Sequence, residues 1–432
     1  MADFEVLVRR VLNVVDHPNA DRLSICTIMG YEAITAKNED GTHRFEPGDL
    51  IVYVPEQALV PHDLLKQYGY WDEAKDRGML AGKQGDRVKI IKLRGVYSQG
   101  LVWPVFSEGA ASWVKNGKDR LYVDEGTDLA AFFGITKHEP KAASFQTGSG
   151  RGGIDQRVVM VMPEFAFSYD FNSLQKDPTM LAQDEVEVTE KLHGTLTRVS
   201  YRPGVTHPDL FGPHNDVAIT TKGQGAKGIV FRNNKFNLGP LYKPTEKELR
   251  QAVWAKRLSW FPWLVNKLGL ADALAPTPGK VNLYVDMALS HGLVDAVSNY
   301  GYCHDCAVDL VGETYGEGVQ KGYSYGQAAP TFRAFDVIID GVALSADEKE
   351  DWLRDHGIAR VPVLFRGLFD LDVLLNLRDG KTTIDGNGKK HIREGIVVTS
   401  AGCQKPRERG GRPIQKMVSP DYLMKEDGTE VQ

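Results

Sequence analysis

Alternating apolar and polar residues fill the first hundred positions of the chain and predict a series of short β-strands. Residues 4–15 are apolar and extended, and residues 22–30 alternate again after a loop with proline and asparagine breakers. Residues 46–55 predict a turn followed by a buried strand, and residues 85–104 predict two more strands joined by a glycine turn. Several short strands with turn signals favour a small barrel.

A glycine-rich stretch, TGSGRGG at residues 147–153, interrupts this pattern and predicts a flexible link. We therefore expect an N-terminal domain over residues 1–140, a link over 141–155 and a second domain over 156–432. The chain length of 432 residues agrees with two or three domains.

Two strand patterns in the second domain flank the tetrapeptide KLHG. Residues 185–190 alternate acidic residues with valine or threonine, as a half-buried strand does, and residues 195–201 alternate again. Lys191 is therefore presented at a bend between two strands.

Residues 251–269 are rich in tryptophan and predict a helix. Their aromatic side chains could stack on bases, but we favour a packed core, because aromatic side chains commonly anchor packing.

Composition places the chain among ordinary soluble globular proteins, with 42% hydrophobic and 25% charged residues. No run of 18 apolar residues occurs, so we expect no transmembrane helix, and the start MADFEVLVRR lacks the apolar stretch of a secretory signal. Four cysteines do not make a disulfide scaffold, so we expect a cytoplasmic protein. Cys303 and Cys306 in CHDC resemble half of a zinc site, but a full site needs four ligands and we favour ordinary buried cysteines.

The net charge of −5 is unusual for a protein that holds nucleic acid by bulk charge. Binding of nucleic acid would have to use local basic patches, whereas an enzyme with a focused groove is compatible with this charge.

Candidate chemistry centres on Lys191, although its KxxG pattern is weak evidence alone. The pattern begins at six lysines: Lys66, Lys75, Lys92, Lys191, Lys222 and Lys425. Lys191 stands apart because it ends a strand, has Glu190 beside it, and is followed by Gly194, which allows close approach of a ligand. Four further segments follow in a fixed order: GETYGEGVQ with Glu313, FRAFDV with Phe335, EGIVV with Glu394, and KMVS with Lys416.

Together these segments resemble the motifs of the covalent nucleotidyltransferase superfamily, and within it the ATP-dependent RNA ligases similar to T4 RNA ligase 2 and the Deinococcus-type RNA ligase. The resemblance spans residues 162–423, apart from an insertion at 242–300 that does not align. His193, at the third position of KLHG, is typical of that branch, whereas DNA ligases usually carry aspartate there.

The resemblance implies a site in which Lys191 attacks the α-phosphorus of ATP and forms a phosphoramidate. The amine must be neutral to do so, and nearby positive charge or a metal favours that form. Lys416 would contact the α-phosphate, and Glu394 would help to hold Mg²⁺ (or Mn²⁺) through its oxygens. The implied nucleotide-binding residues are Glu190 at the adenine edge, His193, Gly194, Lys222, Glu313 at the ribose, Phe335 on the adenine face, and Lys416.

Each assignment has a structural alternative: Phe335 could be plain core, and Glu394 a solvated charge at a strand end. The sequence also departs from the family pattern in two ways. Many relatives have two lysines in the last motif, where this chain has Ile414 and Lys416. The arginine that relatives carry soon after the nucleophile is replaced by a stretch containing Lys222 and Lys227, with Arg198 and Arg232 as competitors for its role.

The N-terminal segments at residues 14–28 and 93–104 resemble an OB-fold of the tRNA-binding type, which holds nucleic acid along a concave strand face. Deinococcus-type RNA ligases carry such a module before the transferase domain, whereas DNA ligases and capping enzymes carry one after the last motif. The sequence ends soon after Lys416, so we expect no C-terminal OB domain.

We therefore expect an α+β protein: an N-terminal OB-fold β-barrel, then a nucleotidyltransferase domain of the ligase adenylylation type, built on antiparallel sheets. Its expected function is ATP-dependent sealing of a 3'-OH to a 5'-phosphate at a nick in duplex RNA or RNA/DNA, by a monomer that uses no membrane. Two alternatives stay open: a DNA ligase or guanylyltransferase, and a nucleic-acid-binding module with an inactive transferase domain.

Overall fold

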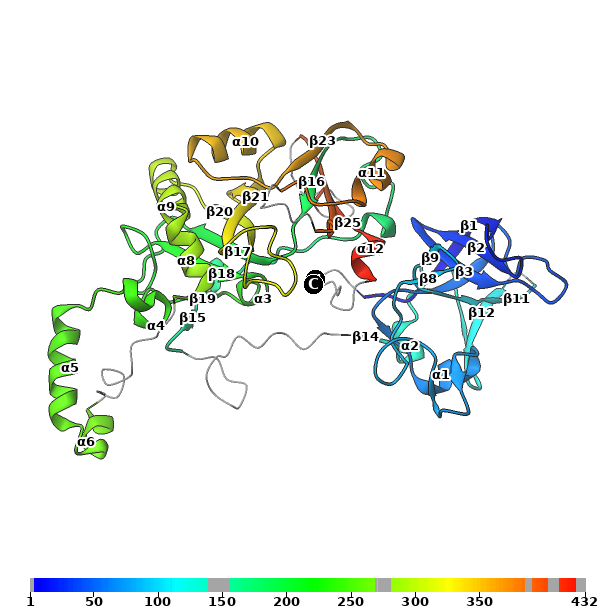
Figure 1. The fold of residues 1–432 in the computed structure, drawn as a ribbon, viewed down its shortest axis with the longest axis horizontal. Helices are drawn as coiled ribbons and strands as arrows, with labels where there is room; N and C mark the ends of the chain where they lie inside the picture. Colours follow the sequence, from blue (N-terminus) through cyan, green and yellow to red (C-terminus); the bar gives the residue numbers. More distant parts are fainter. Residues whose placement is uncertain are drawn as a thin grey trace.

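The computed structural model describes residues 4–109, 111–138, 156–268, 270, 281–384, 391–402 and 412–424. The predicted link over residues 141–155 lies outside the described residues. Figure 1 shows a β-barrel formed by the N-terminal part at one end and a larger α+β body beside it.

A five-stranded sheet forms the N-terminal barrel, as the alternating pattern predicts. β1 is long and pairs with both β2 and β4, and its pairing with β2 shifts register between Val11 and Asn13. Such a bulge bends a strand and lets one sheet close on itself. In sheet order the strands are β10 (Leu101–Pro104), β4 (Leu50–Val54), β1 (Leu7–Asp16), β2 (Leu23–Ile28) and β3 (Tyr31–Ala36).

Smaller elements complete the barrel, and its core is apolar. Trp103 is buried, with the Tyr68 ring stacked on it at 4.1 Å between centroids. The smaller elements are β5 (Ala58–Leu59), α1 (His62–Gln67), β6 (Trp71–Asp72), β7 (Arg77–Gly78), β8 (Ile91–Leu93), β9 (Val96–Ser98), β11 (Phe106–Glu108), β12 (Ala111–Asn116), β13 (Asp119–Tyr122), α2 (Ala130–Phe133) and β14 (Thr136–Lys137).

Two antiparallel sheets form the larger body, which confirms the predicted fold class. The four-stranded sheet has the order β23 (Val363–Leu368), β16 (Glu185–Lys191), β24 (Gly395–Ser400) and β25 (Ile414–Val418). The five-stranded sheet has the order β18 (Val217–Thr221), β17 (Thr195–Tyr201), β20 (Val308–Tyr315), β21 (Thr331–Ile339) and β22 (Val342–Ala343). β15 (Val159–Val161) pairs with β19 (Ile229–Phe231).

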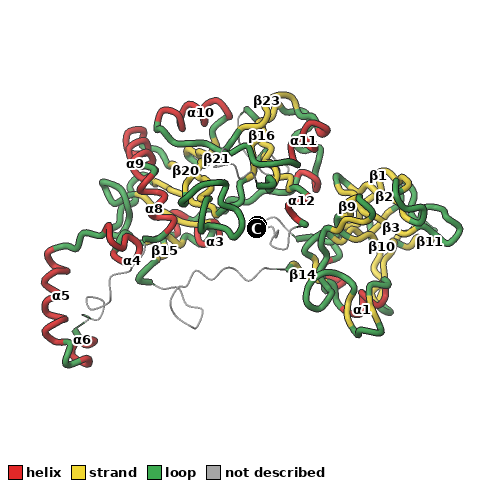
Figure 2. Tube along the Cα trace, viewed as in Figure 1, coloured by secondary structure: helices red, strands yellow, loops and turns green. Residues whose placement is uncertain are grey.

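Helices cover the outer faces of these sheets, as the tube in Figure 2 shows. α8 (Leu283–Ser290) and α9 (Leu293–His304) pack on β17 and β18, where Tyr284, Val285 and Val297 join the buried core. Further helices of this body are α3 (Lys222–Gly225), α4 (Lys235–Leu238), α10 (Ala346–Asp355), α11 (Leu371–Arg378) and α12 (Pro420–Leu423), with short 3₁₀ turns at Pro163–Phe165, Leu174–Lys176 and Gly239–Leu241.

Direct contacts join the barrel to the larger body. The Gly30 N–H donates to the Gln175 carbonyl at 2.9 Å, and the Gln175 amide donates to Gln99 Oε1 at 3.1 Å. The chain approaches closely here, because a Cβ built on Gly30 would lie 2.9 Å from Cα of Gln175. An ion pair between Lys176 and Glu5, and a hydrogen bond from the Tyr97 hydroxyl to a residue of α12, add to this contact.

The tryptophan-rich segment is helical, but the prediction that its aromatic residues form a core is wrong. It folds into α5 (Glu246–Leu258) and α6 (Pro262–Lys267), which project from the body at the end opposite the barrel (Figure 1). Trp260 is 88% exposed and Trp263 is 63% exposed. Ala255 and Val265, not the aromatic residues, are the buried side chains of the two helices.

No helix in the described ranges is both long enough and apolar enough to cross a membrane.

A buried charge cluster fastens the four-stranded sheet to α10. Glu187 on β16 is 1% exposed and accepts ion pairs from Lys349 at 2.9 Å and Arg360 at 2.7 Å, and Arg366 completes the cluster at 2.7 Å. Burial opposes ionisation of this carboxyl, but Lys349 and Arg360 hold the pKa of Glu187 below its ordinary value.

We expect Glu187→Gln to lower the free energy of unfolding by about 3 kcal/mol, because buried cations lose their counter-charge. Urea unfolding measures this loss. Glu185→Gln is the matched control, since Glu185 is exposed on the same strand and its loss should change stability by no more than about 0.5 kcal/mol. Equal stability of the two variants would show that the cluster is not a stabilising contact.

Candidate functional site

Lys191 lies where the chain crosses from one sheet to the other. It is the last residue of β16 in the four-stranded sheet, and Gly395 of β24 is its register partner. Residues 192–194 make the crossing, and β17 begins in the five-stranded sheet at Thr195. The predicted bend between two strands is confirmed, and it is also the junction of the two sheets.

Glu394 precedes β24 and forms an ion pair with the Lys191 amine. The Glu394 side chain is 5% exposed, while that of Lys191 is 24% exposed. Burial disfavours the charged carboxylate, but Lys191 and then His193 outweigh it, so the pKa of Glu394 lies below its ordinary value. Glu394 is therefore a buried carboxylate held in its charged form, not the solvated strand-end charge of the alternative interpretation.

His193 is held by three tyrosines around its ring and backbone. The Tyr422 hydroxyl contacts Nδ1 at 2.9 Å, and the His193 N–H donates to the Tyr325 hydroxyl at 2.7 Å. The Tyr323 ring packs edge-on at 4.7 Å between centroids, and Nδ1 also lies 3.6 Å from Glu394. The imidazole is thus fixed beside the carboxylate rather than facing solvent freely.

Gly194 is required by the close packing of β17 against β20. A Cβ at this position would lie 2.2 Å from the Thr314 carbonyl oxygen, so a larger residue would push the strands apart. The same approach brings Glu313 near Lys191 and Glu394. Burial, with the charge of Glu394 adding to it, raises the pKa of Glu313 to about 8 despite the opposing effect of Lys191.

Lys416 and Lys222 bring two more amines towards Lys191. Lys416 is 6% exposed on β25, and its backbone N–H donates to the Asn172 carbonyl at 3.0 Å. Lys222 begins α3 and pairs with Asp170 at 3.6 Å. Burial lowers the pKa of Lys222, and repulsion from Lys416 and Lys191 lowers it further, against the attraction of Asp170.

Arg198 and Arg232, the alternatives to Lys222 for the role of the family's arginine, have other partners. Arg198 is buried in an ion pair with Asp309 at 3.0 Å, and Arg232 pairs with Asp209. Lys227 is exposed on the surface. Of these candidates, Lys222 is the one whose charge interacts with Lys191 and Lys416.

Glu190 precedes Lys191 on β16 and is 1% exposed. Its Oε2 accepts hydrogen bonds from the Thr383 N–H at 2.8 Å and hydroxyl at 2.7 Å, and Arg393 lies 3.8 Å away. Its Oε1 is buried and has no hydrogen-bond partner among the described residues. A buried acceptor without a hydrogen-bond partner costs free energy, so a ligand that donates a hydrogen bond to Oε1 would be stabilised.

Phe335 on β21 is partly buried, and the Tyr169 ring packs on it with centroids 5.4 Å apart. Phe332, in contrast, is 2% exposed and belongs to the main core. Phe335 packs at the edge of two core clusters and is less buried than Phe332.

Sequence reasoning missed several residues of the site. Tyr325 and Tyr422 position His193, Thr383 holds Glu190, and Asp170 holds Lys222. Only the alternation of Tyr323 and Tyr325, directly after the Glu313 motif, gives a local signal for any of them.

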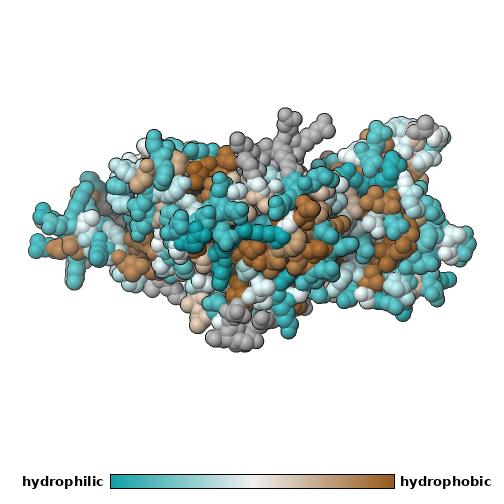
Figure 3. All heavy atoms as spheres, turned by 90° about the horizontal axis from the view of Figure 1, so that it is seen from above, coloured by the Kyte–Doolittle hydropathy of each residue, from teal (hydrophilic) through white to brown (hydrophobic). Residues whose placement is uncertain are grey.

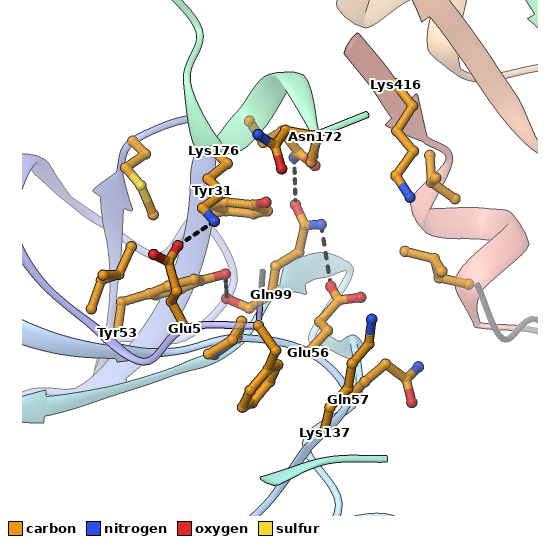
Figure 4. A pocket seen from close by; sticks show the side chains of 18 residues that line it. Glu5, Tyr31, Tyr53, Glu56, Gln57, Gln99, Lys137, Asn172, Lys176 and Lys416 are labelled. Atoms are coloured by element: carbon orange, nitrogen blue, oxygen red, sulfur yellow. Dashed lines mark hydrogen bonds and ion pairs between the residues drawn. The ribbon is translucent and has the colours of Figure 1, made fainter. Parts of the chain in front are cut away.

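A cavity of about 150 Å³ lies between the barrel and the larger body. Figure 4 shows Lys416 extending towards it from β25, with Tyr53, Glu56, Gln99 and Lys137 on the barrel side. The barrel therefore faces Lys416, whose charge, like that of Lys191, acts on Lys222.

The CHDC cysteines differ from each other: Cys306 is buried, but Cys303 is exposed, so the expectation that both are buried is wrong for Cys303. Cys403 lies outside the described residues. Across the described ranges, no group of three or more His, Cys, Asp or Glu side chains is arranged to hold a metal ion by itself.

Comparison with known proteins gives two family matches. A model described as RNA ligase matches residues 184–418, more than half of the chain, and a model described as an OB-fold domain matches residues 6–105. A search of curated protein sequences finds no match.

Solved structures of an RNA ligase from Naegleria gruberi are similar over nearly the whole chain. The structure with PPi has 18% identity and a TM-score of 0.62, covering 99% of this chain and 100% of that chain. A mutant with AMP and Mn has 18% identity, a TM-score of 0.62 and the same coverage. A mutant apo structure has 19% identity and a TM-score of 0.62, covering 99% of each chain. At these identities the likeness establishes the fold.

We expect Glu313→Gln to stabilise the protein in metal-free buffer without nucleotide, and more so at high pH. The Glu313 carboxyl has a pKa of about 8 in the folded protein. The folded state therefore binds more protons than the unfolded state from the ordinary pKa of a glutamate up to about pH 8. Wild-type stability therefore falls as pH rises through this window, and the neutral amide does not share that loss. Thermal melts should show a gain in Tm of at least about 2 °C at about pH 8.5, and a smaller gain at about pH 5.

Glu317→Gln is the control, because Glu317 is exposed after the same strand. A gain for Glu313→Gln that does not vary with pH would contradict the raised pKa.

Proposed function

The chain belongs to the RNA ligase family, and from this premise we propose that it seals 3'-OH/5'-phosphate nicks in duplex RNA or RNA/DNA through a covalent lysyl-AMP intermediate on Lys191. The observation that carries this proposal is the placement of the Lys191 amine at the sheet junction, paired with Glu394 and close to the charges of Lys222 and Lys416.

The first step is attack of the neutral Lys191 amine on the α-phosphorus of ATP. A nitrogen–phosphorus bond forms, the bond from the α-phosphorus to the bridging oxygen breaks, and pyrophosphate leaves. Lys222 and Lys416 add positive charge near the amine, and this charge would stabilise the negative charge that develops on the phosphate oxygens. Most of the catalysis in phosphoryl transfer comes from such positioning and neutralisation.

A divalent cation, Mg²⁺ or Mn²⁺, fits the donor set of this site. Glu394 is a buried carboxylate held in its charged form, and its negative charge helps to raise the pKa of Glu313 to about 8. A cation held by Glu394 would relieve that repulsion, since both metals prefer carboxylate oxygens. When bound it would neutralise charge on the phosphates. The similar ligase of Naegleria gruberi, solved with ATP and Mn, supports this assignment.

Adenosine would be bound by residues from three strands. The unpaired Oε1 of Glu190 is suited to accept a hydrogen bond from the exocyclic amine of adenine. Phe335, which is only partly buried, would stack on the base, and Glu313 would contact the ribose hydroxyls. His193 and Gly194 act as positioning residues, the first beside Glu394 and the second by allowing β17 to approach β20.

The later steps use the same site. The 5'-phosphate of the RNA attacks the phosphorus of lysyl-AMP, which releases Lys191 and leaves an adenylylated end. The 3'-OH then attacks that end, a phosphodiester forms and AMP leaves. The N-terminal barrel, facing Lys416 across the cavity, would hold the nucleic acid, and the protein would act as a monomer.

We expect Lys191→Ala to abolish transfer of label from α-labelled ATP to the protein, because no other amine occupies the crossing position. Wild-type protein, cleared of bound AMP by pyrophosphate, should retain an acid-labile label through denaturation. Lys227→Ala is the matched control, since that lysine is exposed and should label as wild type. Absence of label on wild-type protein would instead favour a nucleic-acid-binding module with an inactive transferase site.

We expect a nick with a 3'-terminal ribose to be sealed at least about tenfold faster than the same nick with a deoxyribose, a difference of about 1.4 kcal/mol in the barrier. The comparison uses one duplex that differs only in that sugar. Equal rates would remove the preference for RNA while leaving the lysyl-AMP chemistry intact.

A further inference from the structure

Two helices, α5 and α6, carry a group of large apolar side chains that contact solvent. We refer to residues 243–268, which include both helices, as the arm. It lies within the segment that does not align with the family motifs, and Figure 1 places it at the end of the molecule opposite the barrel. Its most exposed aromatic residues are Trp260 at 88%, Trp263 at 63%, Trp254 at 58% and Phe261 at 56%.

Packing within the arm does not account for the presence of these exposed aromatic residues. The buried side chains of its helices are Ala255 and Val265, and a capping box at Thr245 and Glu248 starts α5. Exposure of several tryptophans together is unusual on a soluble protein and marks an interaction surface.

The arm is basic in a chain of net charge −5. Its cations outnumber its two acidic residues, Glu246 and Glu248, and one of them, Arg257, lies over the Trp254 ring at 5.7 Å. Figure 3 shows hydrophobic and hydrophilic atoms interleaved at this end of the molecule. The basic residues of the arm are Lys243, Lys247, Arg250, Lys256, Arg257 and Lys267.

We propose that the arm binds single-stranded RNA that extends beyond the ligation site, with bases stacked on Trp260 and Trp263 and phosphates paired with the arm's lysines and arginines. This inference rests on the proposed function. Exposed aromatic rings interleaved with cations are the combination that holds single strands, because each base offers a face for stacking whatever its identity.

The position of the arm favours RNA over a lipid surface. The arm belongs to the body that matches the RNA ligase family, and β16 and β25, which carry Lys191 and Lys416, lie between it and the barrel along the molecule (Figure 1). RNA that passes the site can therefore contact the barrel on one side and the arm on the other. Such an arm would favour nicks that lie near an unpaired region.

The test uses the full-length protein and fluorescently labelled single-stranded RNA. The variant W260S/W263S should bind it at least about tenfold more weakly than wild type, because stacking contributes about tenfold or more in affinity for each base. Its KM should rise for a nicked duplex with a single-stranded tail and change little for the same duplex without a tail. The conservative variant W260F/W263F should recover most of the binding, since phenylalanine also stacks.

Tyr302→Ser is the matched control, since Tyr302 is an exposed aromatic residue of the same body, outside the arm. Wild-type affinity in W260S/W263S, or tryptophan-dependent binding to vesicles of phosphatidylserine and phosphatidylcholine with no effect on RNA, would overturn the proposal.

Labelling with ATP is measured on every preparation. Loss of labelling in wild type refutes the ligase mechanism, whereas normal labelling with unchanged RNA binding refutes the arm alone.

Discussion

The ion pair between Lys191 and Glu394 is the interaction on which the site is built. Lys191 ends β16 and Glu394 precedes β24, and these strands are neighbours with Lys191 opposite Gly395. A buried carboxylate is stable only beside a partner, so the pair depends on correct register between two strands far apart in sequence. A slip of one residue would turn the Lys191 side chain to the other face of the sheet and leave Glu394 unpaired.

The crossing after Lys191 extends this constraint to the second sheet. Gly194 lets β17 lie against β20, where burial, with the charge of Glu394 adding to it, raises the pKa of Glu313 to about 8. Lys222 and Lys416 come from outside this crossing and supply the opposite charge. Acids and amines are thus gathered in one place at the junction of the two sheets.

The strands and the position of Lys191 at a bend could be predicted from the sequence, because both depend on local pattern. β1, β4, β16 and β17 follow from apolar alternation, and Lys191 follows from its place between two of them. The support around the motifs could not be predicted, since Tyr422, Thr383 and Asp170 reach the site only through tertiary packing. The domain boundaries stay predictions, with the glycine-rich link outside the described residues.

The failure at the tryptophan-rich segment has a different physical origin. A helical pattern with large aromatic residues predicts burial only if another element is present to cover it, and a sequence alone does not say where that element is. In α5 and α6 the small side chains Ala255 and Val265 face inward, and the tryptophans face solvent. These rings stay in water in the folded arm as they do in the unfolded chain, so folding of the arm gains no free energy from their burial. Covering them would bring that gain, and the basic residues beside them favour a polyanion with flat, stackable groups.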